Sequence, residues 1–337
     1  MDRVLSGMRP TGPLHLGHWL GALENWVRLQ ETHECFFMVA DLHALMGEYE
    51  NPADIRKNSV EMIVDWIACG INPSNIFIQS EISEHAELAL MLGMLTPLGW
   101  LERNPTYKEQ LREIQGRDLT TYGFLGYPVL QAADILLYKA NKVPVGEDQL
   151  AHLELTREII RRFRHLYKSS LFPEPEALLT KASKILGTDR RKMSKSYGNA
   201  INLSDSEQAI KKKIQSMITD PARIKASDPG HPDSCNVFSY YSMFSRDLVH
   251  DVRDWCTNAK KGCTDCKKNF SDVMVDFLRP VQKKREEIRD SMKDGTRYNV
   301  ALKMLVGAGQ QRAEKVAKGT MSEVKKILNM NQWIHEN

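Results

Sequence analysis

Strand-like and helix-like segments alternate along the first two hundred residues, and this alternation constrains the fold more than any other feature of the sequence. The strand-like segments are short apolar runs at 3–6, 35–40, 76–78 and 143–146. Apolar residues recur at helical spacing over 16–27, 55–68, 86–95 and 149–163. Strands that alternate with helices form a parallel sheet with helices on both faces. The sequence therefore predicts a doubly wound α/β fold, in which ligands bind outside the carboxyl ends of the strands.

The rest of the chain lacks strand-like segments and is predicted to be helical. Helical spacing of apolar residues recurs over 209–217, 270–288 and 313–328. We place the boundary near 202–204, which predicts an α/β domain over 1–204 and a mostly helical domain over 205–337. The last helix is expected to pack back on the first domain.

The composition argues against a membrane protein. The chain contains no run of about eighteen apolar residues, which is the length needed to cross a bilayer. Met1-Asp2-Arg3 leads directly into a strand-like segment, so we expect no signal peptide. We therefore expect a cytoplasmic protein without a membrane partner. The chain has 46 basic and 43 acidic residues, a net charge of +3, so a surface for nucleic acid would require local clusters of basic residues.

The turn His15-Leu16-Gly17-His18 has the composition of a phosphate-binding site. The two histidines are three residues apart, so on a first helical turn their rings face the same way and can donate to phosphate oxygens. The amino end of the helix adds backbone donors and a favourable dipole. Gly17 has no side chain, which lets adenine and ribose lie against the backbone. The alternative is a pair of histidines that caps a surface helix.

A second cluster, Lys192-Met193-Ser194-Lys195-Ser196, lies in the run 190–199, which holds four cations, three hydroxyls and a glycine. A mobile loop of this composition can close on a triphosphate, and its ammonium groups bind more strongly as charge develops on a leaving pyrophosphate. A solvated basic loop is the alternative. Together the two clusters indicate activation of a carboxylate by ATP, through positioning and electrostatic stabilisation rather than an enzyme nucleophile.

Four of the six cysteines are grouped in the second half of the chain, at Cys235, Cys256, Cys263 and Cys266. Their spacing, C-x₂₀-C-x₆-C-x₂-C, supplies four thiolates for either tetrahedral zinc or an iron–sulfur cluster. The irregular first two spacings favour iron and sulfide over a zinc ribbon, which usually pairs two C-x₂-C knuckles. In a cytosolic chain such a group is more typical of a metal site than of disulfides.

The two clusters and three further segments resemble the class I aminoacyl-tRNA synthetases, and most closely their tryptophanyl branch. These segments are residues 6–12 (SGMRPTG), 127–136 (YPVLQAADIL) and 144–149 (PVGEDQ), followed by His152 and Glu154-Leu155-Thr156. The resemblance covers the whole chain and implies a Rossmann-type catalytic domain, a helical anticodon-binding domain and a homodimer. It implies ATP with Mg²⁺, L-tryptophan and tRNA(Trp) as substrates. Tryptophan would first be joined to AMP, with release of pyrophosphate, and then be transferred to the 3′ end of the tRNA.

The resemblance also implies a tryptophan pocket centred on Asp134, which would accept a hydrogen bond from the indole N–H. A site built around such a bond rejects a substrate that lacks it by roughly 10⁴-fold or more. Tyr127, Gln131 and Gln149 would hold the ammonium and carboxylate groups, and His43 would border the ring. The full predicted set is Leu5, Gly7, His43, Tyr127, Gln131, Asp134, Val145 and Gln149.

For ATP the resemblance implies four catalytic groups, His15, His18, Lys192 and Lys195. The predicted ATP-binding set is Arg9, Thr11, Gly12, His15, Gly17, His18, Gly146, Glu147, Asp148, Lys192, Met193, Ser194, Lys195 and Ser196. The chain departs from many tryptophanyl enzymes at three of the predicted positions. Those enzymes carry an aromatic residue where Leu5 stands, glutamine where Arg9 stands and methionine where Gln131 stands.

A subset of tryptophanyl enzymes resembles this chain around the four cysteines, which implies a [4Fe–4S] cluster there, with zinc as the other occupant. The neighbouring lysines are candidate tRNA contacts, because clustered cations attract phosphates. These are Lys260, Lys261, Lys267 and Lys268.

Two other functions fit part of the sequence. A small nucleotidyltransferase shares the His-x-Gly-His turn but lacks the Lys192–Ser196 cluster and the helical second half. A regulator derived from a synthetase, which binds RNA without catalysis, would be free to lose the catalytic groups. His15, His18, Lys192, Lys195 and Asp134 are all present, which favours the enzyme.

Overall fold

The computed structural model describes residues 1–113, 120–179, 185–293 and 298–330. The chain forms two compact units. The sheet unit comprises Met1–Thr11, Ala22–Ala182 and Met292–Asn337, and the helical unit comprises Gly12–Gly21 and Ser183–Ser291. These units divide the chain differently from the expected domains 1–204 and 205–337, and the domain assignment stays a prediction.

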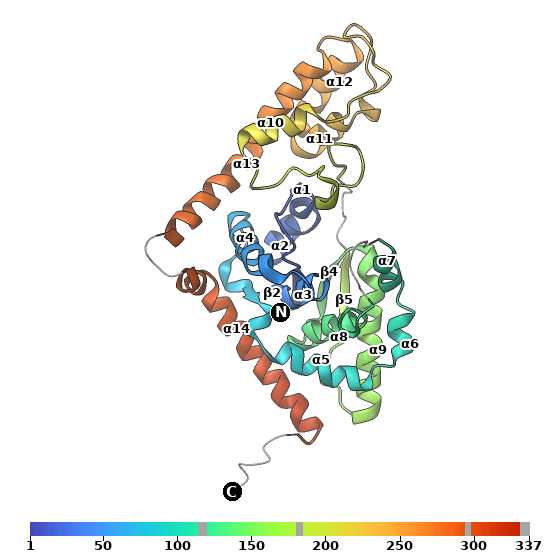
Figure 1. Cartoon of the computed structure of the whole chain (residues 1–337), viewed down its shortest axis with the longest axis vertical. Helices are drawn as coiled ribbons and strands as arrows, with labels where there is room; N and C mark the ends of the chain where they lie inside the picture. The colour runs from blue at the N-terminus through green and yellow to red at the C-terminus, as the bar shows by residue number, and fades with distance from the viewer. Residues whose placement is uncertain (114–119, 180–184, 294–297, 331–337) are drawn as a thin grey trace. The chain divides into compact units, whose positions relative to one another are not determined.

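The sheet unit is built on five parallel strands (Figure 1). They are β1 (Arg3–Met8), β2 (Glu34–Val39), β3 (Ile76–Ile78), β4 (Lys142–Val145) and β5 (Glu176–Leu179), in the order β3-β2-β1-β4-β5. The chain moves outward from β1 to β3 on one side and from β4 to β5 on the other. The reversal between β1 and β4 is the switch point of a doubly wound sheet, where such folds bind ligands. The predicted fold class is confirmed.

The helices of the sheet unit follow the predicted alternation. They are α2 (Glu24–Leu29), α3 (Asp41–Glu48), α4 (Ile55–Ala68), α5 (Glu84–Leu95), α6 (Leu98–Glu102), α7 (Pro105–Glu113), α8 (Tyr122–Leu137), α9 (Leu150–Tyr167) and α14 (Tyr298–Ile327). The helices expected over 55–68, 86–95 and 149–163 correspond to α4, α5 and α9. The helix expected over 313–328 is longer at its amino end, since α14 begins at Tyr298.

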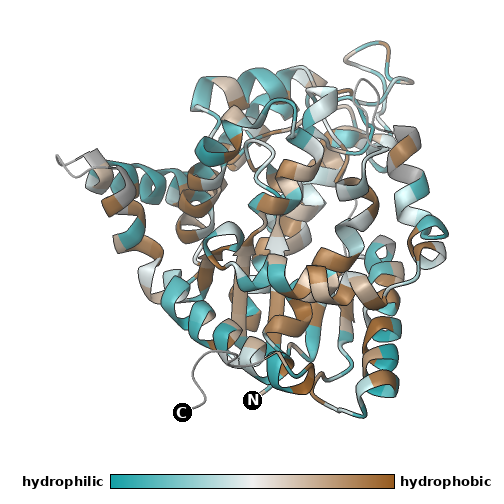
Figure 2. Cartoon of the chain, turned by 60° about the horizontal axis from the view of Figure 1, so that its bottom comes forward, coloured by the Kyte–Doolittle hydropathy of each residue, from teal (hydrophilic) through white to brown (hydrophobic). Residues whose placement is uncertain are grey.

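The middle of the sheet is buried on both faces, as adjacent residues of β2 show. Phe36 packs into a core formed with α5, α8, α9 and α14, and its ring centre lies 4.9 Å from that of Tyr138. Phe37 points to the opposite face and stacks on Trp26 of α2 at 4.6 Å. Because successive strand residues face opposite ways, a strand covered on both faces is apolar throughout. Figure 2 shows these hydrophobic strands between the flanking helices.

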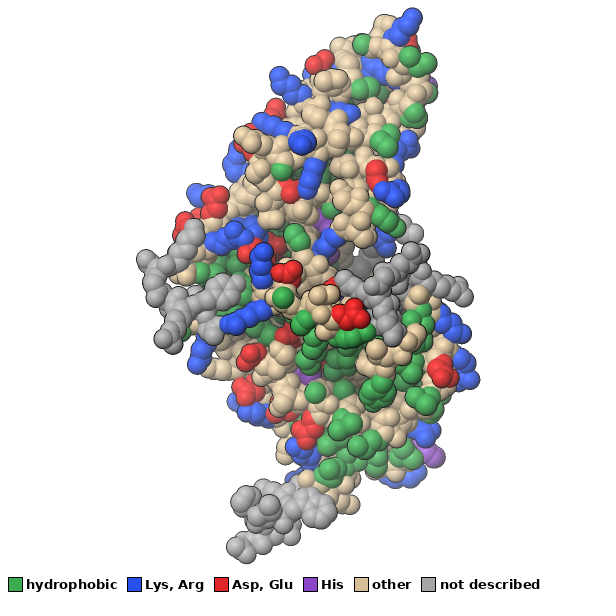
Figure 3. Space-filling view, viewed as in Figure 1, with side chains coloured by type: hydrophobic (Ala, Val, Ile, Leu, Met, Phe, Trp, Pro, Cys, Tyr) green, Lys and Arg blue, Asp and Glu red, His purple; other side chains and the backbone are tan. Residues whose placement is uncertain are grey.

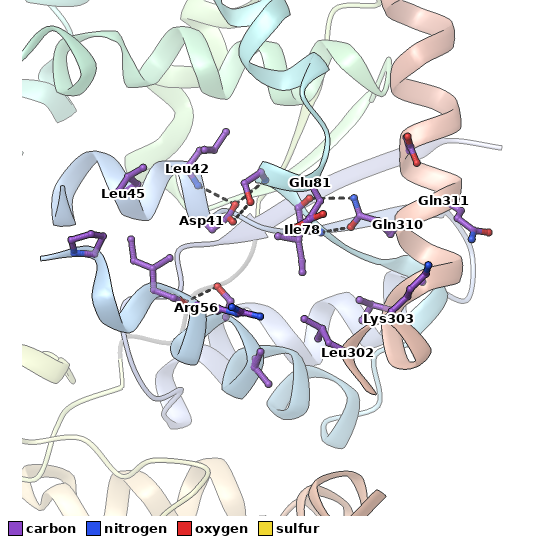
Figure 4. Close-up of a pocket in the computed structure, with 18 residues that line it drawn as sticks. Asp41, Leu42, Leu45, Arg56, Ile78, Glu81, Leu302, Lys303, Gln310 and Gln311 are labelled. Carbon is purple, nitrogen blue, oxygen red and sulfur yellow. Dashed lines mark hydrogen bonds between the residues drawn. The ribbon is translucent and has the colours of Figure 1, made fainter. Parts of the chain in front are cut away.

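Helix α14 covers the edge strand β3. Gly309 lies against the Ile76 carbonyl oxygen so closely that a Cβ atom would not fit. The side-chain oxygen of Gln310 accepts from the Ile78 amide at 2.8 Å, and its side-chain nitrogen donates to the Ile78 carbonyl at 3.4 Å (Figure 4). A cavity of about 940 Å³ opens beside this contact, between α3, α4 and α14. The helix therefore closes a sheet edge that would otherwise be open to pairing.

The helical unit contains α1 (Leu16–His18), α10 (Glu207–Gln215), α11 (Asn236–Phe244) and α12 (Val249–Thr257), and α13 (Cys263–Lys293) begins in it. The aromatic rings of Tyr240, Tyr241 and Phe270 form the centre of its core. α1 continues through a π-helical stretch, Trp19–Leu23, into α2. In the described part of the chain, no helix is long and apolar enough to cross a membrane.

Candidate active site

Polar side chains of the sheet unit follow the carboxyl ends of four neighbouring strands. Arg9 follows β1, His43 lies in α3 directly after β2, Gln79 follows β3 and Gln149 follows β4. The carboxyl ends of parallel strands meet at one edge of the sheet, which is where doubly wound folds bind ligands. The structure thus places two predicted pocket residues, His43 and Gln149, at the edge expected for a site.

Helix α8 presents three predicted residues on one face. Tyr127, Gln131 and Asp134 are spaced i, i+4 and i+7, so they follow one another along the same side of the helix. Tyr127 and Asp134 are buried, at 9% and 1% exposure, and Gln131 is half-buried. Asp134 is thus the acidic group of an otherwise apolar stretch, and its charge requires compensation.

Three donors surround the Asp134 carboxylate. His43 Nε2 lies 2.7 Å from Oδ2, while Gln79 Nε2 and His85 Nδ1 lie 2.8 and 2.6 Å from Oδ1. Burial alone would raise the pKa of Asp134, but the nearby His43 and His85 lower it to about 2. The carboxylate is therefore ionised at neutral pH and acts purely as an acceptor.

A second chain of polar contacts leads to Gln149. The Tyr127 hydroxyl lies 2.7 Å from His152 Nε2, and His152 Nδ1 lies 3.0 Å from the side-chain oxygen of Gln149. Burial raises the pKa of Tyr127, so its hydroxyl stays protonated and donates to His152. The side-chain oxygen of Gln149 can only accept, so His152 Nδ1 carries a proton and donates to it. This arrangement orients the Gln149 amide with its oxygen toward His152.

The other predicted residues of the sheet unit differ in their exposure. Leu5 and Val145 are strand residues that are buried in the core, at 3% and 8% exposure. Gly7, Arg9, Thr11 and Glu147 are exposed, and Gly146 is half-buried. The side chain of Asp148 lies outside the described residues.

In the helical unit, the two histidines of the predicted phosphate site lie together. His15 is the residue before α1, and its Nδ1 accepts from the Gly17 amide at 3.1 Å. His18 Nδ1 accepts from the His15 amide at 3.1 Å, and the ring centres are 3.9 Å apart. A Cβ at Gly17 would lie 2.8 Å from the His15 ring. The structure therefore gives Gly17 a role that the sequence did not indicate, which is to make room for the capping ring of His15.

Both rings are neutral at physiological pH. Burial and then the Lys195 ammonium lower the pKa of His15 to about 4, and burial, His15 and Lys195 lower that of His18 to about 2. Because each Nδ1 accepts a backbone hydrogen bond, each neutral ring carries its proton on Nε2. The pair thus presents two uncharged N–H donors, which is the chemistry that phosphate oxygens require.

Lys195 of the second cluster reaches the turn that carries the histidines. Its Nζ atom donates to the Gly12 carbonyl at 2.9 Å, and Gly12 has a φ of 126°, a conformation that favours glycine. Met193 is buried at 5% exposure, Ser194 and Lys195 are half-buried, and Lys192 and Ser196 are exposed. The structure therefore brings both halves of the predicted ATP signature together within the helical unit.

Asn199 holds the lysine-rich loop in shape. Its side-chain oxygen accepts from the Ser194 amide at 2.9 Å, and its nitrogen donates to Asp189 at 2.7 Å and to the Lys192 carbonyl at 3.2 Å. The residue is 3% exposed. The sequence did not indicate this role, because the burial that obliges the Asn199 amide to find partners is decided by the fold.

All four predicted metal ligands line one cavity of about 20 Å³ in the helical unit. Burial and then the neighbouring thiols raise the pKa of Cys256 and Cys266, as expected for sulfur atoms close to one another. Within the described ranges, however, no three His, Cys, Asp or Glu side chains are arranged to hold a metal ion. The cavity has room for about one water. The thiols converge, and the metal centre stays a prediction.

Three of the four lysines predicted to contact tRNA have local partners. Lys260 pairs with Asp254 at 2.6 Å, Lys261 lies 3.5 Å above the Trp255 ring, and Lys267 donates to the Gln215 carbonyl at 2.8 Å. Lys268 is exposed.

The chain is similar over nearly its whole length to tryptophan–tRNA ligases. The family of class I tRNA synthetases (W and Y) matches residues 2–279. The tryptophan–tRNA ligase of Thermotoga maritima is 49% identical, over 97% of this chain and 99% of that protein. That of Aquifex aeolicus is 41% identical, over 97% and 100%. The crystal structure of Campylobacter jejuni tryptophanyl-tRNA synthetase, complexed with ADP and tryptophan, has a TM-score of 0.88 at 30% identity, over 97% of this chain and 99% of that one.

Proposed function

The chain belongs to the class I tRNA synthetases of the tryptophan and tyrosine group, and we infer that it is a tryptophan–tRNA ligase. It activates L-tryptophan with ATP, forming tryptophanyl-adenylate and pyrophosphate, and then transfers tryptophan to the 3′ end of tRNA(Trp). Magnesium accompanies ATP as part of that substrate. The full-length similarity to ligases of this one specificity is the observation that carries the inference.

A direct test is the tryptophan-dependent exchange of pyrophosphate into ATP, measured in parallel with tyrosine and phenylalanine. We expect exchange with tryptophan and at least about 10⁴-fold lower kcat/KM with phenylalanine, because a buried acceptor would be left without its donor. A preference for tyrosine would contradict the assigned specificity. No exchange with any amino acid would favour the non-catalytic regulator.

Within the sheet unit, we propose that the edge at the carboxyl ends of the strands holds tryptophan. Asp134 accepts the indole N–H, and His43 borders the ring. Tyr127, Gln131 and Gln149 hold the ammonium and carboxylate groups. The ionised state of Asp134 and the ordered chain from Tyr127 to Gln149 support these roles.

Within the helical unit, we propose that His15 and His18 donate their Nε2–H groups to phosphate oxygens of ATP. Lys192 and Lys195 stabilise the negative charge that develops on the leaving pyrophosphate. The tryptophan carboxylate attacks the α-phosphorus, the bond to pyrophosphate breaks, and no enzyme group is modified. Neutral histidines suit this task, because they donate without a change of protonation.

We propose that Cys235, Cys256, Cys263 and Cys266 bind a [4Fe–4S] cluster, which would hold this segment of the helical unit together. Their place around one cavity and their mutual electrostatic repulsion as thiolates support a bound cation. Iron, sulfide and zinc content of anaerobically purified protein tests this proposal. Iron and sulfide support the cluster, zinc alone supports the single ion, and no metal contradicts both.

We further propose that two copies of the chain associate through an apolar face of the sheet unit. Leu45, Leu90, Leu98 and Tyr122 are exposed large hydrophobic residues there, around a cavity of about 570 Å³ whose described lining residues are all uncharged. Figure 3 shows hydrophobic side chains gathered over this face. Contiguous apolar surface of this kind marks an interface. In a symmetric dimer the same face of a second copy would cover it, and no unpaired charge would be buried. Sedimentation of the wild type and of Leu90→Glu tests the dimer.

We propose that the 205–337 domain reads the anticodon, and that its exposed Lys268 contacts tRNA phosphates. Lys268→Ala should raise the KM for tRNA and weaken its salt dependence, because one phosphate contact is lost. Pyrophosphate exchange, which needs no tRNA, should be unchanged. An unchanged KM for tRNA would remove Lys268 from the interface.

A further inference from the structure

His85 is a buried polar residue that none of the roles above uses. It lies in the first turn of α5, at 0% exposure, in a helix that is otherwise apolar on its buried side. Its Nδ1 atom lies 2.6 Å from Asp134 Oδ1, and its Nε2 atom lies 2.9 Å from the hydroxyl of Tyr138. The ring also stacks against Phe77 at 5.9 Å, which fixes its plane.

With a neutral His85 ring, the three groups allow one arrangement of protons. Asp134 is ionised, so the ring nitrogen that faces it must carry a hydrogen. Burial raises the pKa of Tyr138, so its hydroxyl keeps its single proton. In a neutral imidazole with Nδ1–H, Nε2 is an acceptor, and the Tyr138 hydroxyl donates to it. The opposite tautomer would turn a lone pair toward a carboxylate at 2.6 Å, which is repulsive.

This arrangement determines how much of Asp134 is available to a substrate. Oδ1 accepts from both His85 and Gln79, so both of its lone pairs are in use. Oδ2 accepts from His43. A carboxylate offers about four lone-pair sites, so the described residues leave one site, and it is on Oδ2.

We propose that His85, held as its Nδ1–H tautomer by Tyr138, is a positioning residue for the selection of the amino acid. Together with Gln79 it occupies Oδ1 and leaves Oδ2 as the acceptor for a single N–H donor on the substrate ring. The inference rests on the proposed role of Asp134 as that acceptor. His85 itself touches no substrate.

The test compares His85→Leu, which removes both ring nitrogens, with His85→Asn, whose amide can offer an N–H near the position of Nδ1. Tryptophan-dependent pyrophosphate exchange gives kcat and the KM values for tryptophan and ATP. His85→Leu should raise the KM for tryptophan about 10- to 100-fold, as for loss of a hydrogen bond to a charged group, and leave the KM for ATP within about twofold. His85→Asn should recover most of this loss.

Leu92→Ala is the matched structural control, since Leu92 lies two turns along the same helix and is fully buried. It should lower the melting temperature without a change in the KM for tryptophan.

Tyr138→Phe removes one oxygen and should fold even if His85→Leu does not. It should raise the KM for tryptophan about 3- to 30-fold by leaving His85 Nε2 without its donor. The ¹⁵N shifts of the His85 ring should report the Nδ1–H tautomer in the wild type and a mixture in Tyr138→Phe.

Three outcomes would overturn the inference: an unchanged KM for tryptophan in Tyr138→Phe, equal effects of His85→Leu and His85→Asn, or equal effects of His85→Leu and Leu92→Ala. Asp134→Asn separates this failure from that of the proposed function. If Asp134→Asn raises the KM for tryptophan and the His85 variants do not, only the positioning role of His85 is contradicted. If Asp134→Asn has no effect, the assignment of Asp134 falls as well.

Discussion

The Nζ atom of Lys195 lies 2.9 Å from the carbonyl oxygen of Gly12, so the lysine-rich loop and the histidine turn meet inside one compact unit. The two segments are 183 residues apart in the sequence. Their contact keeps an ammonium group beside the two neutral histidines, where its charge lowers the pKa of both rings.

Replacement of Lys195 by alanine should lower kcat for tryptophan-dependent exchange about 10²- to 10³-fold, since a preorganised charge at the leaving group is lost. The KM for tryptophan should change little. Lys211→Ala is the control, because Lys211 pairs with Glu207 on the surface of α10, and its kcat should stay within about twofold of the wild type. A similar loss in both variants would show that the effect is not specific to the site.

Gly17→Ala should reduce activity by displacing the His15 ring, which lies 2.8 Å from the position of the added Cβ. The ring would leave its cap on the Gly17 amide and aim its Nε2–H elsewhere. Gly21→Ala is the matched control in the same helical run, because nothing lies within 4 Å of its added Cβ. Pyrophosphate exchange by both variants, with melting temperatures, checks this. Equal activities would mean that the close fit at Gly17 is unimportant.

His15 and His18 should remain neutral well below the pH at which an ordinary histidine is protonated. Their lowered pKa values mean that the unfolded chain binds more protons than the folded one below about pH 6.5. These groups therefore stabilise the fold fully above that pH, and their contribution declines as pH falls toward about 4, the value for His15. In ¹⁵N spectra of the whole protein, assigned with His15→Gln and His18→Gln, both rings should stay in the Nε2–H form at pH 5.5. Titration near pH 6.5 would contradict this.

Gly309→Ala should destabilise the packing of α14 on β3, since the new methyl group would clash with the Ile76 carbonyl. That carbonyl belongs to the backbone and cannot move aside as a side chain can. Overpacking of this kind costs about 1–3 kcal/mol of unfolding free energy. Gly319→Ala lies in the same helix with open space around it and should stabilise the protein by about 0.5–1 kcal/mol. Denaturant unfolding of the two variants measures both changes. If both substitutions raise the free energy of unfolding, the close approach of Gly309 to the Ile76 carbonyl is contradicted.

Much of the fold and several candidate site residues could be predicted from the sequence, because the signals are local. The strands around residues 3–8, 34–39 and 76–78 follow from short apolar runs, and the doubly wound sheet follows from their alternation with helices. His15, His18 and Lys195 were singled out by their spacing and composition, and the structure brings them together. Asp134 stood out as a carboxylate in an apolar helix.

The sequence did not determine the partners of these candidate site residues, because a contact between distant residues depends on packing rather than on a local pattern. Gln79, His85 and His43 reach Asp134 from 55, 49 and 91 residues away, each on a different element. Only the sheet order and the packing of α5 on α8 bring them to one carboxylate. The same holds for Gln310, which meets Ile78 across 232 residues. The residue types were set by the sequence, whereas the proton arrangement around Asp134 was decided by the tertiary structure, since it arises from which donors surround each oxygen.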